Sequence, residues 1–103
     1  MPFPKTNGLN SSLGPLYVLR LYVAGHEANS QLARENLRLL CDEYLKDRSL
    51  IEEVDVLQDP SSAFQYHILV TPTLVMLKPG PPATVVGNLA DKDRVLKALR
   101  LKG

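Results

Sequence analysis

Two strand-like runs separated by a long amphipathic segment most constrain the fold of this chain. The first run, Tyr17 to Ala24, is almost continuously apolar and rich in β-branched and aromatic residues. Such a run predicts a strand that is covered on both faces, as in a mainly parallel sheet. The second run, Thr71 to Lys78, follows much later in the chain and also predicts a strand. Strands separated by helical segments indicate an α/β domain.

The segment between the two runs predicts a helix and then another strand. Its apolar residues recur at helical spacing and form one face, which consists of Ala33, Leu37, Leu40, Cys41 and Tyr44. Asn29 or Ser30 is predicted to cap this helix, because a short side-chain oxygen accepts from the first amides. The helix is expected to end near Lys46, and a strand is expected over 50–57. A strand, a helix and a strand in this order predict a parallel pair with a right-handed crossover.

The rest of the chain predicts short elements that are separated by strong breakers. Asp59-Pro60 is a helix start, with Asp as the cap and Pro in the first turn, and this helix is expected to reach about Ile68. The proline-rich segment 79–82 ends the third strand. A short strand over 84–86 and a last helix capped by Asp91 complete the order βαβαββα.

Composition and charge describe one ordinary domain. The chain has 103 residues, of which 45% are hydrophobic and 22% charged, and its net charge is +1. Residues 1–15 lack periodicity and are interpreted as a flexible N-terminal arm, and residues 16–103 as a single domain. The balanced charge argues against nucleic-acid binding, and the apolar runs are too short for a membrane span. A single cysteine and the lack of an apolar leader indicate the cytoplasm.

Residues that carry chemistry are few and scattered. Cys41 lies on the apolar helix face and is interpreted as a buried structural thiol. His26 and Glu27 supply at most half of a metal site, since such sites need three or four ligands and His67 is the one other histidine. Acidic residues of the second strand are interpreted as a solvated edge: Glu52, Glu53 and Asp55. We therefore expect no catalytic residues, no metal and no cofactor, and no enzyme activity.

The order of segments resembles the thioredoxin-like fold without its redox chemistry. In such folds the first strand-to-helix turn carries a cysteine pair, and a Thr-Pro, usually cis, lies opposite it. Here the turn is Gly25 to Ser30 and contains no cysteine. Two interpretations of Pro72 stay open: a static cis-proline turn, or a slow cis–trans isomerisation that gates a structural change. A scaffold without the dithiol favours a binding module over an oxidoreductase.

An ordered set of short motifs is similar to the KaiB family of bacterial circadian clock proteins. The motifs cover about residues 16 to 100 in unbroken order and are Tyr17–Gly25, Asn29-Ser30, Val54–Leu57, Asp59-Pro60, Thr71–Leu74, the turn 79–82, Gly87–Leu89 and Asp93–Leu96. The resemblance implies a non-catalytic regulator that binds the ATPase ring of a KaiC-type protein, with KaiA or a clock histidine kinase as further partners. Its output is expected to be a circadian, clock-like or stress-adaptation response.

The resemblance also implies two folds for one sequence. One is a thioredoxin-like monomer that binds partners. The other is an oligomeric ground-state fold, a dimer or tetramer, in which the C-terminal half is repacked. The second half fits this idea, because short elements depend on tertiary packing and two packings can lie close in free energy.

The family pattern also implies which residues form the partner-binding or switch surface. They are Tyr17, His26, Glu27, Asn29, Ser30, Pro72, Gly87 and Asn88. The chain departs from the family pattern at Ala28, at Asn88 and in its basic C-terminal end, which is typical of a divergent member and favours KaiC-type binding over KaiA binding. The alternatives are a thioredoxin-fold redox protein and a solo kinase-docking sensor domain.

Overall fold

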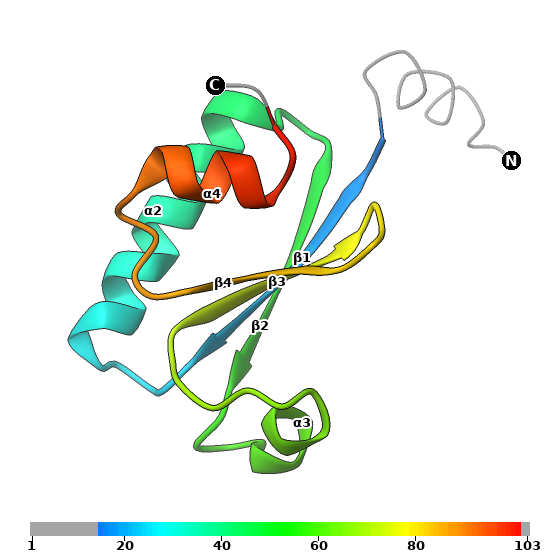
Figure 1. Ribbon diagram of the computed structural model, residues 1–103. Coiled ribbons are helices and arrows are strands. Elements are labelled where there is room, and N and C mark those ends of the chain that lie inside the picture. The colour runs from blue at the N-terminus through cyan, green and yellow to red at the C-terminus, as the bar shows by residue number, and fades with distance from the viewer. Residues whose placement is uncertain (1–14, 102–103) are drawn as a thin grey trace, which may run out of the picture.

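The computed structural model describes residues 15–101, and its elements follow the predicted order βαβαββα (Figure 1). The predicted flexible arm, residues 1–15, lies outside the described residues except for Pro15. The elements are β1 (Tyr17–Val23), α2 (Ala28–Tyr44), β2 (Ser49–Asp55), α3 (Pro60–Gln65), β3 (Thr73–Lys78), β4 (Ala83–Val86) and α4 (Lys92–Ala98).

The four strands form one mixed sheet in the order β2-β1-β3-β4. The predicted parallel pairing of β1 with β2 is confirmed, with Tyr17 opposite Ser49 and Val23 opposite Asp55. β3 runs antiparallel to β1, and β4 runs antiparallel to β3. Because β1 has a neighbour on each side, its backbone is paired along both edges, and Leu19 is fully buried.

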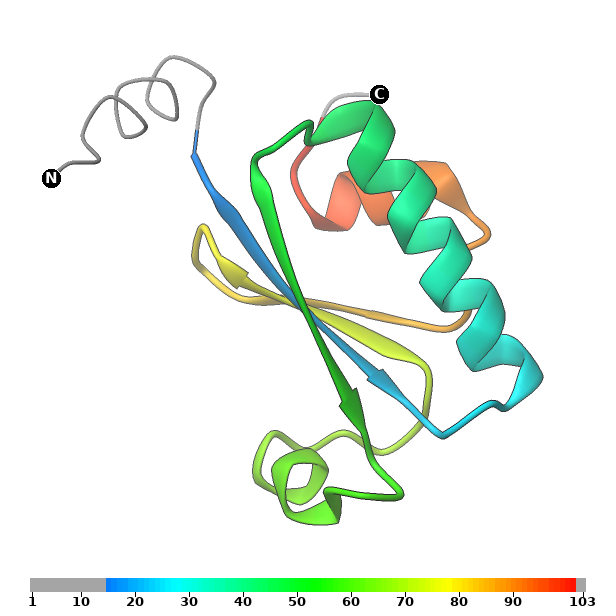
Figure 2. The ribbon, with the colours of Figure 1, turned by 180° about the vertical axis from the view of Figure 1, so that it is seen from behind.

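Helices α2 and α4 lie together over one face of the sheet (Figures 1 and 2). Side chains alternate between the faces of a strand, so every second residue of β1 points toward these helices. The main core joins these side chains to the apolar stripes of the two helices, and includes Leu19, Leu21, Leu37, Leu40, Cys41, Leu74, Met76, Val95, Leu96 and Leu99. The prediction that Cys41 is a buried structural residue is confirmed, as its exposed fraction is 6%.

Helix α3 lies at the other end of the fold, beyond the carboxyl ends of β1 and β2 (Figure 1). A smaller cluster on the opposite face of the sheet joins Ala63 of α3 to Tyr22 and Val75. Within residues 15–101, no helix is both long and apolar enough to cross a membrane.

Two predicted boundaries in the second half were wrong. α3 ends at Gln65 rather than near Ile68, because the chain turns at His67, whose φ of 59° is left-handed and ends a right-handed helix. β3 begins at Thr73 rather than Thr71, since Pro72 has no N–H to donate to a neighbouring strand. The Thr71–Pro72 peptide bond is cis, as the thioredoxin-like pattern suggests.

Two leucines of α2 provide a matched test of this core. Leu37 is 2% exposed and Leu39 is 50% exposed. We expect Leu37→Ala to lower the free energy of unfolding by about 2–5 kcal/mol, because it removes buried methyl groups and leaves a cavity. Leu39→Ala should cost less than about 1 kcal/mol. Urea denaturation of both variants checks this, and equal losses would contradict the assignment of the buried face.

Candidate functional site

Three segments that are distant in the sequence meet beside the carboxyl end of β1. The first turn of α2 contributes Asn29, whose side-chain oxygen accepts from the side-chain amide of Asn88 at 3.5 Å. Gly87 donates its backbone N–H to the carbonyl of Pro72 at 2.9 Å. Asn36 of α2 donates to the Asn88 carbonyl at 2.9 Å and fixes this segment on the helix. These contacts link four of the residues predicted from the sequence into one group, which consists of Asn29, Pro72, Gly87 and Asn88.

Tyr17 does not join this group. It begins β1, at the opposite end of the strand from the loop, and its side chain is buried. The guanidinium of Arg48 lies over its ring at 5.8 Å from the centroid. In the described fold Tyr17 is thus a core residue at the far end of the internal strand β1.

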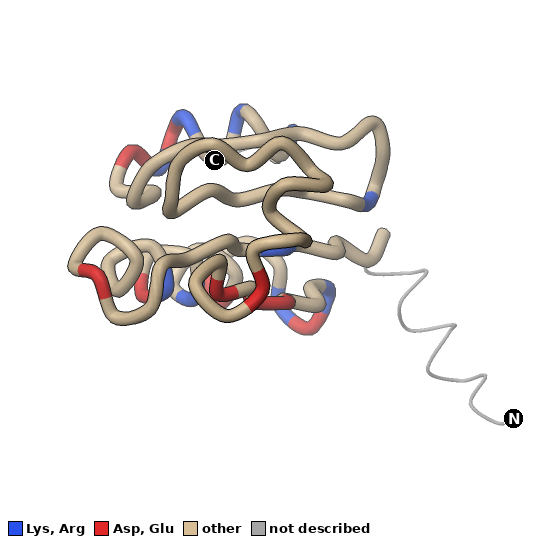
Figure 3. The backbone as a smooth tube through the Cα atoms, turned by 90° about the horizontal axis from the view of Figure 1, so that it is seen from below, with Lys and Arg blue, Asp and Glu red and all other residues tan. Residues whose placement is uncertain are grey.

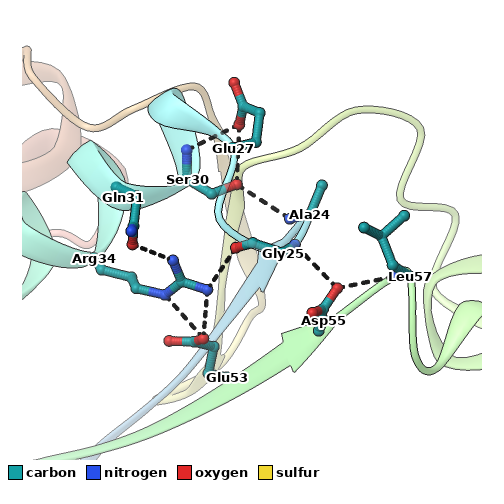
Figure 4. Close-up of polar contacts among 9 residues, drawn as sticks. All are labelled: Ala24, Gly25, Glu27, Ser30, Gln31, Arg34, Glu53, Asp55 and Leu57. Carbon is teal, nitrogen blue, oxygen red and sulfur yellow. Dashed lines mark hydrogen bonds and ion pairs between the residues drawn. The ribbon is translucent and has the colours of Figure 1, made fainter.

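Glu27 is the last residue of the loop after β1 and caps the N-terminus of α2 (Figure 4). Its carboxylate accepts from the backbone N–H of Asn29 at 3.0 Å and from that of Ser30 at 2.9 Å. The prediction of Asn29 or Ser30 as the cap was wrong, because the longer Glu27 side chain reaches the same amides and the helix begins earlier, at Ala28. Ser30 is instead fully buried, and its hydroxyl accepts from the backbone N–H of Ala24 at 3.1 Å.

These contacts stabilise the charged form of Glu27. The hydrogen bond from the Asn29 amide, followed by those from Ser30, lowers the pKa of the Glu27 carboxyl below its ordinary value. A negative charge at this position also complements the partial positive charge of the helix N-terminus.

The exposed polar side chains of the site can donate and accept hydrogen bonds. His26 and Asn29 are exposed, whereas Pro72 is buried. Burial raises the pKa of the Cys41 thiol, which disfavours a reactive thiolate there. Among residues 15–101, no three His, Cys, Asp or Glu side chains are grouped as a metal site requires. Figure 3 shows that basic and acidic residues are interspersed along the described chain, so neither sign of charge is confined to one part of the molecule.

The residues of β2 and α2 that support the loop were not predicted from the sequence. The interpretation of the acidic residues of β2 as a solvated edge is confirmed for Glu52 and Glu53, which are exposed on this edge strand. It is wrong for Asp55, which is half-buried. Arg34 of α2 contacts Glu53 at 2.9 Å, and Asp55 accepts from the Gly25 amide at 3.1 Å. The available signal was the parallel pairing of β1 and β2, which places the end of β2 beside the exit from β1.

Comparison with known sequences identifies related proteins over most of the chain. The KaiB domain pattern matches residues 20–101. The chain is 39% identical over 82 residues to the circadian clock protein KaiB3 of Synechocystis sp., covering 80% of each chain. It is 40% identical over 85 residues to the circadian clock oscillator protein KaiB of Synechococcus sp. strain CC9311, covering 82% of this chain and 71% of that protein.

Comparison with solved structures shows the fold. The N-terminal domain of Synechococcus elongatus SasA superposes with a TM-score of 0.70 at 21% identity, covering 87% of this chain and 90% of that one. Fasciola hepatica thioredoxin superposes with a TM-score of 0.68 at 18% identity, covering 94% and 91%. The predicted thioredoxin-like fold is therefore confirmed.

The Glu27 cap makes a prediction about pH. Because its pKa is lowered on folding, its stabilising effect is fully present above the unfolded value of about 4.3 and is lost as pH falls through the folded-state pKa. Glu27→Gln should therefore be less stable than the wild type near neutral pH, and the difference should shrink in acid. Urea denaturation between about pH 3 and 7 measures this.

A control for this experiment is Glu35→Gln, which removes a carboxylate from the same helix without touching the cap. Glu35 forms an exposed ion pair with Arg38 at 2.7 Å, and such pairs contribute little. Stability curves of the wild type and Glu27→Gln that stay parallel over the whole pH range would contradict the cap.

Proposed function

Because the chain belongs to the KaiB family, we propose that this clock protein is a cytoplasmic, non-catalytic regulator that binds the ring of a KaiC-type ATPase. The observation that carries the proposal is the family match over residues 20–101, which begins within β1 and extends beyond the end of α4. The related proteins are named as circadian clock proteins rather than as enzymes. The KaiC-type partner is the one that the family resemblance implies.

The proposed contact surface consists of His26, Asn29 and Asn88. Support comes from their position: His26 and Asn29 are exposed on the loop and first turn after β1, and Asn88 lies against Asn29. Pro72 and Gly87 lie behind this surface and hold the β3 and β4 ends together. Polar groups on a braced backbone suit protein recognition, because little conformational entropy is lost on binding.

We include a change of fold in the proposal. The described residues form the thioredoxin-like arrangement, and the oligomeric ground-state fold, with its C-terminal half repacked, is the second state. Support comes from the second half, in which α3 has 6 residues, β4 has 4 and α4 has 7. Phe64 and Leu69 are 86% and 92% exposed, so another packing has apolar surface to bury. A rare binding state lowers the apparent affinity in proportion to its population.

The mass of the protein tests this proposal directly. We expect light scattering to give a dimer or tetramer for the protein alone. After prolonged incubation with a KaiC-type ATPase and ATP, single protomers should be bound to the ring. A monomer that binds at once would support the partner but contradict the second fold. A protein that never binds would contradict the proposed function.

The contact surface is tested by the double substitution His26→Ala/Asn29→Ala. We expect affinity for the KaiC-type ring to fall by about tenfold or more, as at an interface hot spot. Lys46→Ala, beyond the other end of α2, is the matched control and should bind like the wild type. Equal affinities for all three proteins would place the interface elsewhere.

The redox alternative is tested by insulin reduction. A single thiol, buried at 6% exposure, argues against a dithiol mechanism. Activity in this assay that disappears in Cys41→Ser would favour the redox hypothesis over the clock regulator. The solo sensor-domain alternative predicts binding to the ring without oligomerisation at rest.

A further inference from the structure

Gly25 is the residue at which the chain leaves β1 and turns toward the proposed contact surface. Its φ is +54°, in the left-handed region that favours glycine. A Cβ atom at this position would lie 3.3 Å from the Cδ1 of Leu57. The backbone here is therefore both unusual in conformation and closely approached by the chain that leaves β2.

Charged side chains from two elements bind both polar groups of Gly25 (Figure 4). Asp55, at the end of β2, accepts from the Gly25 N–H at 3.1 Å. Arg34, on α2, donates from Nη2 to the Gly25 carbonyl at 2.9 Å. With its N–H and its C=O both occupied, Gly25 has little freedom to rotate either of its peptide groups.

Each of these two side chains is itself fixed by a second contact. The same Oδ1 atom of Asp55 accepts from the Leu57 N–H at 2.9 Å, so it ties the exits of β1 and β2 together. The Nε of Arg34 donates to Oε2 of Glu53 at 2.9 Å. Hydrogen bonds between a charged and a neutral group are stronger than those between two neutral groups, so this arrangement resists movement of the loop.

We propose that Asp55 and Arg34 are positioning residues that hold the β1–α2 loop in the shape that presents His26 and Asn29 to the partner. This inference rests on the proposed function for its partner, and on the contacts of Gly25 for its mechanism. Neither residue is part of the proposed contact surface. Both act through the backbone of Gly25.

The sheet provides a matched control pair. Arg20 of β1 and Glu52 of β2 form an ion pair at 2.7 Å that joins these two strands. Residues 52 and 53 are consecutive in a strand and point to opposite faces of the sheet. Arg20→Gln therefore removes a comparable ion pair without altering any contact of Gly25.

The experiment compares Asp55→Ala, Asp55→Asn, Arg34→Gln and Arg20→Gln in the full chain. Three quantities are measured for each: urea stability, hydrogen exchange of the Gly25 amide by NMR, and affinity for a KaiC-type ATPase. Asp55→Ala and Arg34→Gln should speed Gly25 exchange and lower affinity by about tenfold. Asp55→Asn keeps an acceptor oxygen, so its Gly25 exchange rate and its affinity should stay close to those of the wild type. Arg20→Gln should leave the Gly25 exchange rate and the affinity unchanged, whatever its effect on urea stability.

Two results would overturn the inference. One is Gly25 exchange in Asp55→Ala and Arg34→Gln that equals the wild-type rate. The other is an affinity loss that follows stability alone, with Arg20→Gln as weak a binder as Arg34→Gln. If the wild type itself does not bind the ring, the proposed function fails, and the Gly25 exchange rates still decide whether Asp55 and Arg34 position the loop.

Discussion

The pairing of β1 on both of its edges is the constraint on which the rest of the structure depends. β2 lies parallel on one side and β3 antiparallel on the other, so the backbone of β1 is satisfied without solvent. This arrangement allows Leu19 and Leu21 to be almost completely buried under α2 and α4. It also determines where the loop of the candidate site lies, because the chain leaves β1 beside the end of β2 and beside the start of β3.

The two halves of the chain are stabilised differently. The first half contains a long helix, α2, with a continuous apolar stripe and two seven-residue strands in full register. The second half has short elements that are joined by turns and held by contacts to the first half. Within the second half, Arg100 also donates to the carbonyls of Pro79 and Pro81 at 2.9 Å each and joins the β3–β4 turn to the end of α4. Such elements have little stability in isolation, which is the physical basis for proposing a second packing.

In the proposed function, the candidate site uses the thioredoxin-like scaffold for recognition rather than for redox chemistry. Where a thioredoxin-like protein has a cysteine pair, this chain has a loop whose polar groups are engaged by Glu27, Asp55 and Arg34. The loop thus gains rigidity from charged hydrogen bonds, and the exposed groups of His26 and Asn29 are displayed from a fixed backbone. A rigid display lowers the entropy lost on binding.

The sequence by itself determined the element order, the buried central strand, the apolar face of α2 and the burial of Cys41, because burial is encoded in local periodicity. It also indicated the family through its ordered motifs. Only the tertiary structure decided which polar group meets which amide. Asp55 reaches Gly25 across 30 residues, and Asn88 reaches Asn29 across 59. Only the structure shows that Glu27, rather than Asn29 or Ser30, caps α2. Only the structure shows that Tyr17 lies far from the other candidate site residues. Hydrogen-bond partners depend on strand register and loop direction, and these are set by packing between distant segments rather than by neighbours in the chain.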